Sequence, residues 1–377
     1  MGANHLCLLY LAVASTIFTS AIAYNSLRSF ILEEACVRLP QLRILVVSFV
    51  LAGGSSLVLN GQTGGNTITA HVTAARTAAD DTWLILYSEL CGVAMGAGGR
   101  ASSVVPPPGA ARGRQAGPPP REAWYHDPVK VFDNMYVFET DDPSAWAIQT
   151  SAGIIMIDAN FDYQVKEGIV DAMSKVGLDP AQIKYVVVTH AHGDHSAGAK
   201  YLQDTYGARV LMSEVDWFSL SQPQRGGAFA GMPLPKKDMV IMNGQKLTLG
   251  DTTITMYLTP GHTMGTVSLV IPVKDKSTPH TAAFWGGTAI NANTPNDNLV
   301  AYSSSARRFA GIAAAAGADV LLSNHARYID MDKRIGANRA NPAGPNAFLL
   351  NPTRVGQYMQ VADRCAQAVA LFAAAKK

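Results

Sequence analysis

The run THAHGDHSAGA (residues 189–199) constrains the fold more than any other part of the chain. It follows the apolar segment KYVVVT, whose β-branched residues predict a buried strand. Four polar side chains stand within six residues at the end of that strand: His190, His192, Asp194 and His195. They cannot all be buried unless something compensates them, and a divalent cation such as zinc suits imidazole and carboxylate ligands. The run therefore predicts a metal site at the carboxyl end of a strand, where α/β proteins place their sites.

Two further histidines stand in similar places. His262 follows the apolar segment TTITMYLT, and His325 ends the segment ADVLLSNH. Alone, either would be an ordinary core or surface histidine; together with the first run, each has the position that a metal site demands. The two histidines before Gly193 are spaced to converge on one ion, and the Asp-His pair after it can face a second ion from the start of a helix. The sequence thus predicts a site for two metal ions.

From Trp124 onward, short apolar runs alternate with helical patterns, which predicts an α/β domain of roughly 250 residues. Strands are predicted at 135–139, 145–150, 153–158, 184–189 and 208–213, and at the segments KLTLG, TTITMYLT, TVSLVIP, TAAFWGG and ADVLLSN. Helices are predicted at 165–176, 197–206 and 309–315, with an amphipathic closing helix at 352–375.

The chain begins with two hydrophobic segments inside residues 1–60. Residues 6–23 end in Ala-Ile-Ala, as a signal peptide does before its cleavage site, and residues 45–59 form a second apolar run broken by Gly-Gly-Ser-Ser. We expect export, which makes the protein periplasmic or secreted. A retained N-terminal membrane anchor and a wrongly assigned start of the gene are the alternatives.

The next segment, residues 61–121, is predicted to be a low-complexity, disordered linker. Its end, 104–121, is rich in Pro, Gly and Ala and has no apolar period. The catalytic domain is accordingly expected to be 122–377.

The four cysteines form no pair with the short spacing of a zinc knuckle or a redox motif. Cys365 alone lies with the motifs, so we expect it to be a buried free thiol without a disulfide partner in that region.

Charge argues against nucleic acid as a partner. The formal net charge is +2 at pH 7, and no basic block or interleaved basic and aromatic run is present. We expect a small-molecule substrate and a monomer.

The motifs carry a resemblance to a known family. THAHGDH resembles the HxHxDH signature of the metallo-β-lactamase superfamily, and PGHTMGTVSL (260–269) resembles its next motif. The similarity covers the chain from about Trp124 to its end, and in detail it is to the subclass B3 metallo-β-lactamases. It implies a four-layer αββα sandwich with the metals in a cleft along the edge between two sheets.

The resemblance also implies which residues bind two zinc ions. One ion would take His190, His192 and His262. The other would take Asp194, His195 and His325, with Asp194 also steering the attacking water. Asp158, at the end of a predicted strand, matches the acidic residue that orients a ligating imidazole from behind; a simple turn aspartate is the alternative.

The chain departs from many relatives at Gly286-Gly287-Thr288. Thioesterases, ribonucleases and many lactonases of the superfamily resemble one another in having a metal-bridging Asp there, and this chain has none. Its absence is typical of subclass B3. The serine that helps to hold the β-lactam carboxylate is missing too, which leaves Thr288 and Asn291 as candidate substrate contacts. Phe229, in the Gly- and Pro-rich loop 220–238, is a third candidate if that loop covers the cleft.

We therefore expect a zinc-dependent hydrolase that opens the β-lactam amide by attack of a metal-bound hydroxide. A hydrolase of the same fold acting on a lactone, thioester or other ester is the main alternative. A nuclease and a non-catalytic binding protein are weaker alternatives, disfavoured by the missing bridging Asp and by the six intact ligand positions respectively.

Overall fold

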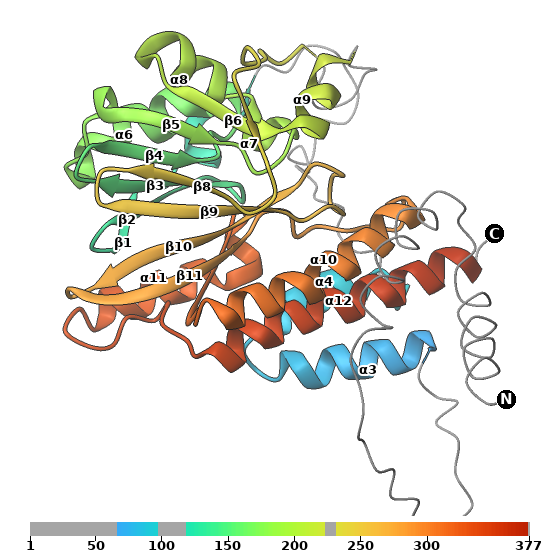
Figure 1. Cartoon of the computed structure of the whole chain (residues 1–377). Coiled ribbons are helices and arrows are strands. Elements are labelled where there is room, and N and C mark those ends of the chain that lie inside the picture. Colours follow the sequence, from blue (N-terminus) through green and yellow to red (C-terminus); the bar gives the residue numbers. More distant parts are fainter. Residues whose placement is uncertain (1–65, 97–117, 223–230, 376–377) are drawn as a thin grey trace, which may run out of the picture. The chain divides into compact units, whose positions relative to one another are not determined.

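The structure is a computed structural model, which describes residues 66–96, 118–222 and 231–375. These residues belong to a compact unit that spans Gln62–Lys377. Two β-sheets lie at its centre, and helices cover the outer face of each, so the predicted four-layer αββα sandwich is confirmed (Figure 1).

The first sheet has seven strands in the order of the sequence. They are β1 (Val129–Phe132), β2 (Met135–Glu139), β3 (Ser144–Thr150), β4 (Gly153–Ile157), β5 (Ile183–Val187), β6 (Arg209–Ser213) and β7 (Met239–Ile241). The strands from β1 to β4 are antiparallel, whereas those from β4 to β7 run parallel. The parallel half matters for function, because the metal-ligand run follows β5.

The second sheet has five strands in the order β12-β11-β10-β9-β8. They are β8 (Gln245–Leu249), β9 (Thr252–Leu258), β10 (Val267–Asp275), β11 (Thr278–Trp285) and β12 (Val320–Ser323). β12 alone is parallel to its neighbour in this sheet, so β11 and β12 end at the same edge.

Helices form the two outer layers. On the first sheet lie α5 (Asp162–Gln164), α6 (Asp171–Met173), α7 (Gly193–Ser196) and α8 (Ala199–Tyr206). The second sheet packs against α10 (Asn296–Ala315) and α12 (Pro352–Ala375). Two more helices, α9 (Glu214–Ser221) and α11 (Met331–Ala340), follow β6 and the 3-10 turn η5 (Ala326–Ile329).

The apolar side chains of a strand point alternately to its two faces, and they therefore belong to two different cores. In β4, Ile155 and Ile157 face the other sheet, whereas Ile154 and Met156 face the helices of the first layer. Successive side chains of a strand point to opposite faces, so one strand serves both cores. Because both faces are covered, these strands read as continuous apolar runs in the sequence.

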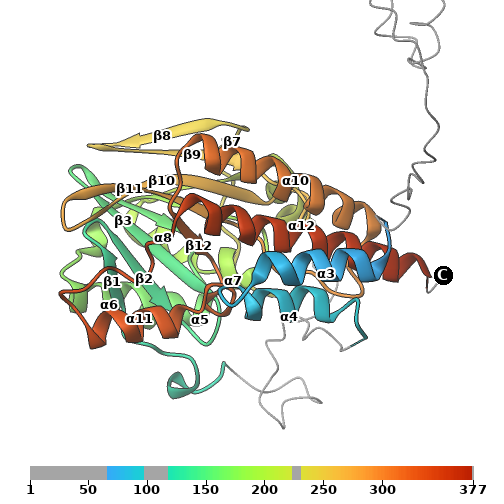
Figure 2. The same ribbon diagram turned by 90° about the horizontal axis from the view of Figure 1, so that it is seen from below.

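The segment predicted to be a disordered linker contains two helices, α3 (Ile68–Ala79) and α4 (Leu84–Gly92), so the prediction for residues 61–121 is wrong for its described first part. Both helices pack along α12 (Figure 2). Between them, Trp83 packs edge-on against Tyr358 with 5.1 Å between ring centroids, and its indole N–H donates to the carbonyl of Arg354. The sequence of α3 is rich in alanine and α4 is only nine residues long, and their partner α12 lies about 270 residues later.

The expectation of a free Cys365 is also wrong, because Cys91 of α4 and Cys365 of α12 form a disulfide. The sequence offered no short spacing to indicate it, since 274 residues separate the two cysteines. The bond fixes the N-terminal helices to the catalytic domain, which therefore begins before residue 122.

Most predicted strands and the closing helix are confirmed, with ends shifted by up to three residues. Besides α3 and α4, the sequence analysis missed the short edge strands β1 and β7 and the helices α9 and α11. Helix α10 is also longer than predicted. None of the helices in the described ranges is long and apolar enough to cross a membrane. The two N-terminal hydrophobic segments lie outside the described residues.

Replacing both Cys91 and Cys365 by Ala should lower the free energy of unfolding by about 2–4 kcal/mol, because the disulfide closes a long loop of the unfolded chain. Urea denaturation followed by far-UV circular dichroism measures the change. Reduction of the wild-type protein should have the same effect, and Ser88→Ala, on the exposed face of α4, serves as the control. Equal urea midpoints with and without the disulfide would contradict this coupling.

Candidate metal centre

The six predicted ligands meet at one edge of the sandwich. His190 and His192 lie in the turn after β5, and Asp194 and His195 belong to α7. His262 lies in the loop between β9 and β10, and His325 lies two residues after the end of β12. They form two groups, each suited to holding a metal ion, with the membership predicted from the sequence.

The three-histidine group presents three ring nitrogens to one point. Nε2 of His262 lies 3.0 Å from Nε2 of His190 and 3.0 Å from Nδ1 of His192. In the Asp-His-His group, Nε2 of His195 lies 3.2 Å from Nε2 of His325 and 3.3 Å from a carboxylate oxygen of Asp194. The rings of His190 and His195 are 4.2 Å apart, so the two groups are adjacent.

Hydrogen bonds on the outer side of the rings fix their orientation. Nδ1 of His190 donates to the carbonyl oxygen of Gly286 at 3.0 Å, and Nδ1 of His262 donates to that of Ala289 at 2.6 Å. A carbonyl oxygen can only accept, so the ring proton of each histidine lies on Nδ1. Their Nε2 atoms consequently carry lone pairs, and both lone pairs point inward.

Two carboxylates, the buried Asp158 and the half-buried Asp142, hold the rings of the other group. Nδ1 of His195 donates to Asp158 at 2.9 Å, and Nδ1 of His325 donates to Asp142 at 2.8 Å. The contact expected of Asp158 is confirmed. Such partners of ligating imidazoles set the tautomer and make the ring a better metal ligand.

The donor sets fit a divalent cation. Two neutral imidazole lone pairs facing each other across 3.0 Å cannot form a hydrogen bond, so they need an electrophile between them. The second carboxylate oxygen of Asp194 is buried without a hydrogen-bond partner among the described residues, which is costly unless a cation is near. Nitrogen and carboxylate donors of this kind suit zinc.

Electrostatics distinguishes the two groups. Burial, reinforced by neighbouring imidazoles, holds the pKa of His190 well below its usual value and lowers the pKa of His262 to about 3. Burial opposes charge on His195 as well, but Asp194 and Asp158 outweigh it and raise the pKa of His195 to about 10. The first group is thus a set of neutral nitrogen ligands, and the second is an anionic site that attracts positive charge.

Asp158 also holds the turn that carries the ligands. Its carboxylate accepts from the backbone N–H of Thr189 at 2.7 Å and from the hydroxyl of Thr189 at 2.8 Å. The side-chain amide of Asn324, next to His325, donates to the same carboxylate at 3.3 Å. Asp158 has a φ of +60°, a rare conformation for a residue other than glycine, and these bonds hold it there.

The position of the missing bridging carboxylate lies against the three-histidine group. An added Cβ on Gly287 would lie 2.8 Å from the Cβ of His262 and 2.9 Å from a methyl carbon of Thr266. Contacts this short require the neighbours to move, so this backbone leaves no room for an aspartate beside His262 as it now stands.

The candidate substrate contacts fare differently. Thr288 is fully buried, and its hydroxyl lies within hydrogen-bond distance of the Ser323 and Tyr358 hydroxyls, so it offers a substrate no accessible surface in this structure. Asn291 is half-buried in a turn, where its side chain accepts from the N–H of Asn293. Its contact with substrate stays a prediction, and Phe229 lies outside the described residues.

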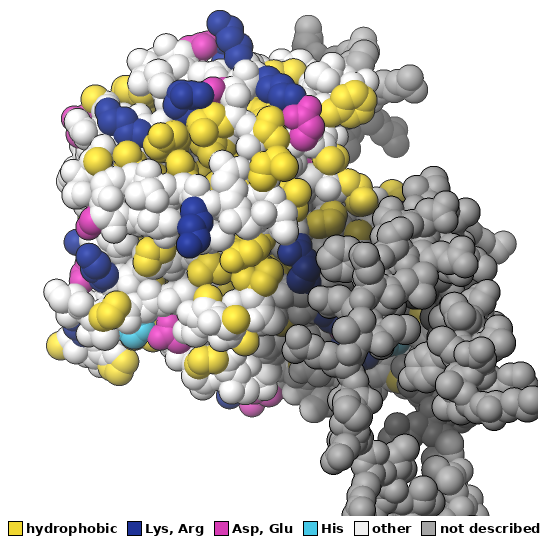
Figure 3. Space-filling model, in the orientation of Figure 1, with side chains coloured by type: hydrophobic (Ala, Val, Ile, Leu, Met, Phe, Trp, Pro, Cys, Tyr) yellow, Lys and Arg dark blue, Asp and Glu magenta, His cyan; other side chains and the backbone are white. Residues whose placement is uncertain are grey.

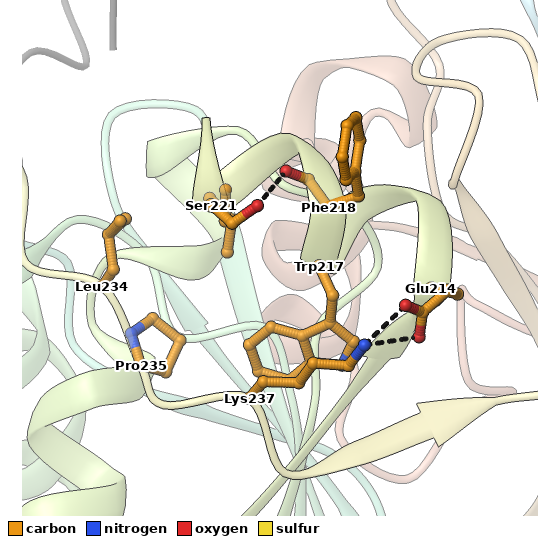
Figure 4. Close-up of a pocket in the computed structure, with 8 residues that line it drawn as sticks. Glu214, Trp217, Phe218, Ser221, Leu234, Pro235 and Lys237 are labelled. Carbon is orange, nitrogen blue, oxygen red and sulfur yellow. Dashed lines mark hydrogen bonds and ion pairs between the residues drawn. The ribbon is translucent and has the colours of Figure 1, made fainter. Parts of the chain in front are cut away.

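A separate apolar hollow of about 210 Å³ lies beside α9. Trp217, Phe218, Leu234 and other residues line it, and none of the six ligand residues does (Figure 4). On the face shown in Figure 3, Lys and Arg side chains are scattered singly and form no continuous basic patch.

The sequence analysis did not single out Asp142, which lies in the turn between β2 and β3. Asp142 pairs with Arg327 at 2.9 Å as well as with His325, over 180 residues away. A turn aspartate gives no sign of such a contact, because the contact depends on the β2–β3 turn and the end of β12 meeting at the same edge of the sandwich.

Fold and site together define an αββα protein with two adjacent metal-ligand groups. The family model of the metallo-β-lactamase superfamily matches residues 139–277. Similar solved structures include the subclass B3 metallo-β-lactamase BJP-1 of Bradyrhizobium japonicum, with a TM-score of 0.58, 28% identity and coverage of 68% of this chain and 98% of that one. The native FEZ-1 metallo-β-lactamase of Legionella gormanii has the same fold, with a TM-score of 0.55, 23% identity and coverage of 63% and 93%.

Sequence relatives have other activities in their names. Hydroxyacylglutathione hydrolase of Acidiphilium cryptum is 33% identical over 97 residues, which is 26% of this chain and 34% of the relative. N-acyl homoserine lactonase AttM of Rhizobium radiobacter is 31% identical over 116 residues, 28% of this chain and 42% of the relative. The chain thus spans less than half the length of these relatives. The chain is similar to the metallo-β-lactamase superfamily over residues 139–277, and it shares its fold with subclass B3 enzymes of that superfamily.

Asp142→Asn should weaken the binding of one metal ion by about 10- to 100-fold, because the neutral amide no longer holds the His325 ring as a carboxylate does. Zinc competition with a chromophoric chelator measures the change. Asp141→Asn, an exposed neighbour, is the matched control and should bind zinc as the wild type does. Equal affinities for the two variants would refute the role of Asp142.

Proposed function

We propose that this protein is a dizinc hydrolase that opens the amide bond of β-lactams. The observation that carries the proposal is the ligand arrangement: Asp-His-His for the second ion, with glycine at position 287 in place of a bridging carboxylate. The similarity to BJP-1 supports it, since it extends over 98% of that subclass B3 enzyme.

The side chains have separate tasks in this reaction. Bound zinc supplies a Lewis acid for the substrate carbonyl and lowers the pKa of the attacking water. Asp194 turns one carboxylate oxygen towards His195 and His325. Its other oxygen, buried and unpartnered among the described residues, is placed to accept a hydrogen bond from the water and to steer its proton. Asp158 and Asp142 keep the imidazoles of their group in a single orientation throughout.

A lactone or thioester substrate is the second candidate. The named activities of the sequence relatives favour it: one is a hydroxyacylglutathione hydrolase and another an N-acyl homoserine lactonase. The buried hydroxyl of Thr288 also favours it, because the expected anchor for a β-lactam carboxylate is not exposed at that position.

The site of action that we propose is outside the cytoplasm. The Cys91–Cys365 disulfide supports this, since disulfides persist in oxidising compartments and are rare in reducing ones. Fractionation of cells that produce the full chain, with thiol labelling, tests it. The oxidised protein should appear in the periplasmic or secreted fraction, and a reduced cytoplasmic protein would contradict the proposal.

The substrate proposal is tested by one hydrolysis panel on the full chain. Nitrocefin and a carbapenem should be hydrolysed with a kcat/KM at least tenfold above those for an N-acyl homoserine lactone and S-lactoylglutathione. A chelator should abolish the activity and added zinc should restore it. Faster hydrolysis of the lactone or the thioester would mean that this class of compound, and not a β-lactam, is the substrate. Activity that survives the chelator would refute a metal-dependent mechanism.

A further inference from the structure

We propose that Asp216 is a positioning residue for the three-histidine group, through which it sets the affinity for one of the two metal ions. The inference rests on the proposed metal centre but is independent of the substrate. Asp216 lies in α9, outside every motif that indicated the site, and only 1% of its surface is exposed.

The Asp216 carboxylate joins the two loops that carry the three histidines. One oxygen accepts from the backbone N–H of Ala191 at 2.9 Å, and Ala191 stands between His190 and His192. The same oxygen accepts from the hydroxyl of Thr263 at 2.8 Å, and Thr263 directly follows His262. A single carboxylate therefore fixes the spacing between loops about 70 residues apart.

The peptide groups at Ala191 are held on both sides. The N–H of Ala191 meets Asp216, while its carbonyl accepts from the hydroxyl of Ser196 at 3.1 Å. A shift of this residue would turn both neighbouring imidazoles, because the backbone between them is only one residue long. Loss of the Asp216 contact thus alters the directions of the His190 and His192 lone pairs together.

Helix α9 is a firm base for this contact. The hydroxyl of Ser213 accepts from the N–H of Asp216 and caps the helix, and the indole of Trp217 donates to the carbonyl of Met239 in β7. Packing on the other side is equally close, since a Cβ added to Gly265 would overlap the Asp216 carboxylate. The carboxylate has little freedom to move away from the two loops.

The role is specific to one group of ligands. Asp158 and Asp142 contact the rings of His195 and His325 in the other group. No Lys or Arg of the described chain forms an ion pair with Asp216, so hydrogen bonds from Ala191, Thr263 and the backbone of Gly265 are what stabilise its buried charge. Burying a carboxylate costs free energy, which its hydrogen bonds must offset. Those hydrogen bonds in turn hold the two loops in place.

The test measures stepwise zinc affinity of the full chain without substrate, by competition with a chromophoric chelator. Asp216→Asn should lower the affinity for one of the two zinc ions by at least about tenfold and leave the affinity for the other nearly unchanged. Thr263→Val removes the hydroxyl and keeps the Asp216 carboxylate, so it should lower the affinity for the same ion. Glu214→Gln, an exposed position on the same helix, is the control and should bind both ions as the wild type does.

Double variants separate positioning from a general loss of structure. Asp216→Asn and Thr263→Val should be non-additive, because each breaks the same contact. The effects of Asp216→Asn and Asp142→Asn should be additive, because each lowers the affinity for a different ion. Far-UV circular dichroism checks the fold of every variant, and Thr263→Val carries the test if Asp216→Asn does not fold.

The outcomes distinguish this inference from the proposed function. A wild type that binds no zinc would overturn both. Two tightly bound ions in the wild type and in Asp216→Asn alike would overturn the role of Asp216 alone. An equal loss of affinity for both ions in Asp216→Asn would also overturn it. Additive effects of Asp216→Asn and Thr263→Val would do the same.

Discussion

The structure depends on bringing unprotonated ligand atoms face to face in a buried place. Two imidazole nitrogens 3.0 Å apart, each with its proton committed to a carbonyl on the outer side, repel each other unless a cation lies between them. The carbonyls of Gly286 and Ala289 enforce this arrangement for the three-histidine group. In the other group, Asp158 and Asp142 fix the orientation of the two rings. Much of the polar structure around the site serves to keep these lone pairs and carboxylates in place.

The fold supplies this arrangement because strands from both sheets end at one edge. β5 delivers the first ligand run, β12 delivers His325, and β4 ends immediately before Asp158. The contact of Pro143 with His325 joins the β2–β3 turn to the same edge. The N-terminal helices stand behind this assembly: α4 packs against η5, which follows His325, and a disulfide ties α4 to α12. The catalytic domain is therefore larger than its motifs indicate.

The ligands and most strands could be predicted from the sequence because their signals are local. A strand and the residues that end it are neighbours in the chain, so the run at His190 indicated both position and chemistry. The two helices before residue 97 could not be predicted in this way, since their buried faces pack against α12, which lies far away in the sequence. Asp142 and Asp216 were missed for the same reason, because each acts on residues far away in the sequence. Thr288 was chosen for its place after a strand, but its hydroxyl turns towards Ser323 and Tyr358.

The central claim is that the six ligands bind two metal ions, and anomalous diffraction at the zinc edge tests it most directly. Crystals of the zinc-loaded full chain should give two peaks per chain. One should lie among His190, His192 and His262, and the other among Asp194, His195 and His325. A chain with no peak, or with its peaks away from these side chains, would contradict the account.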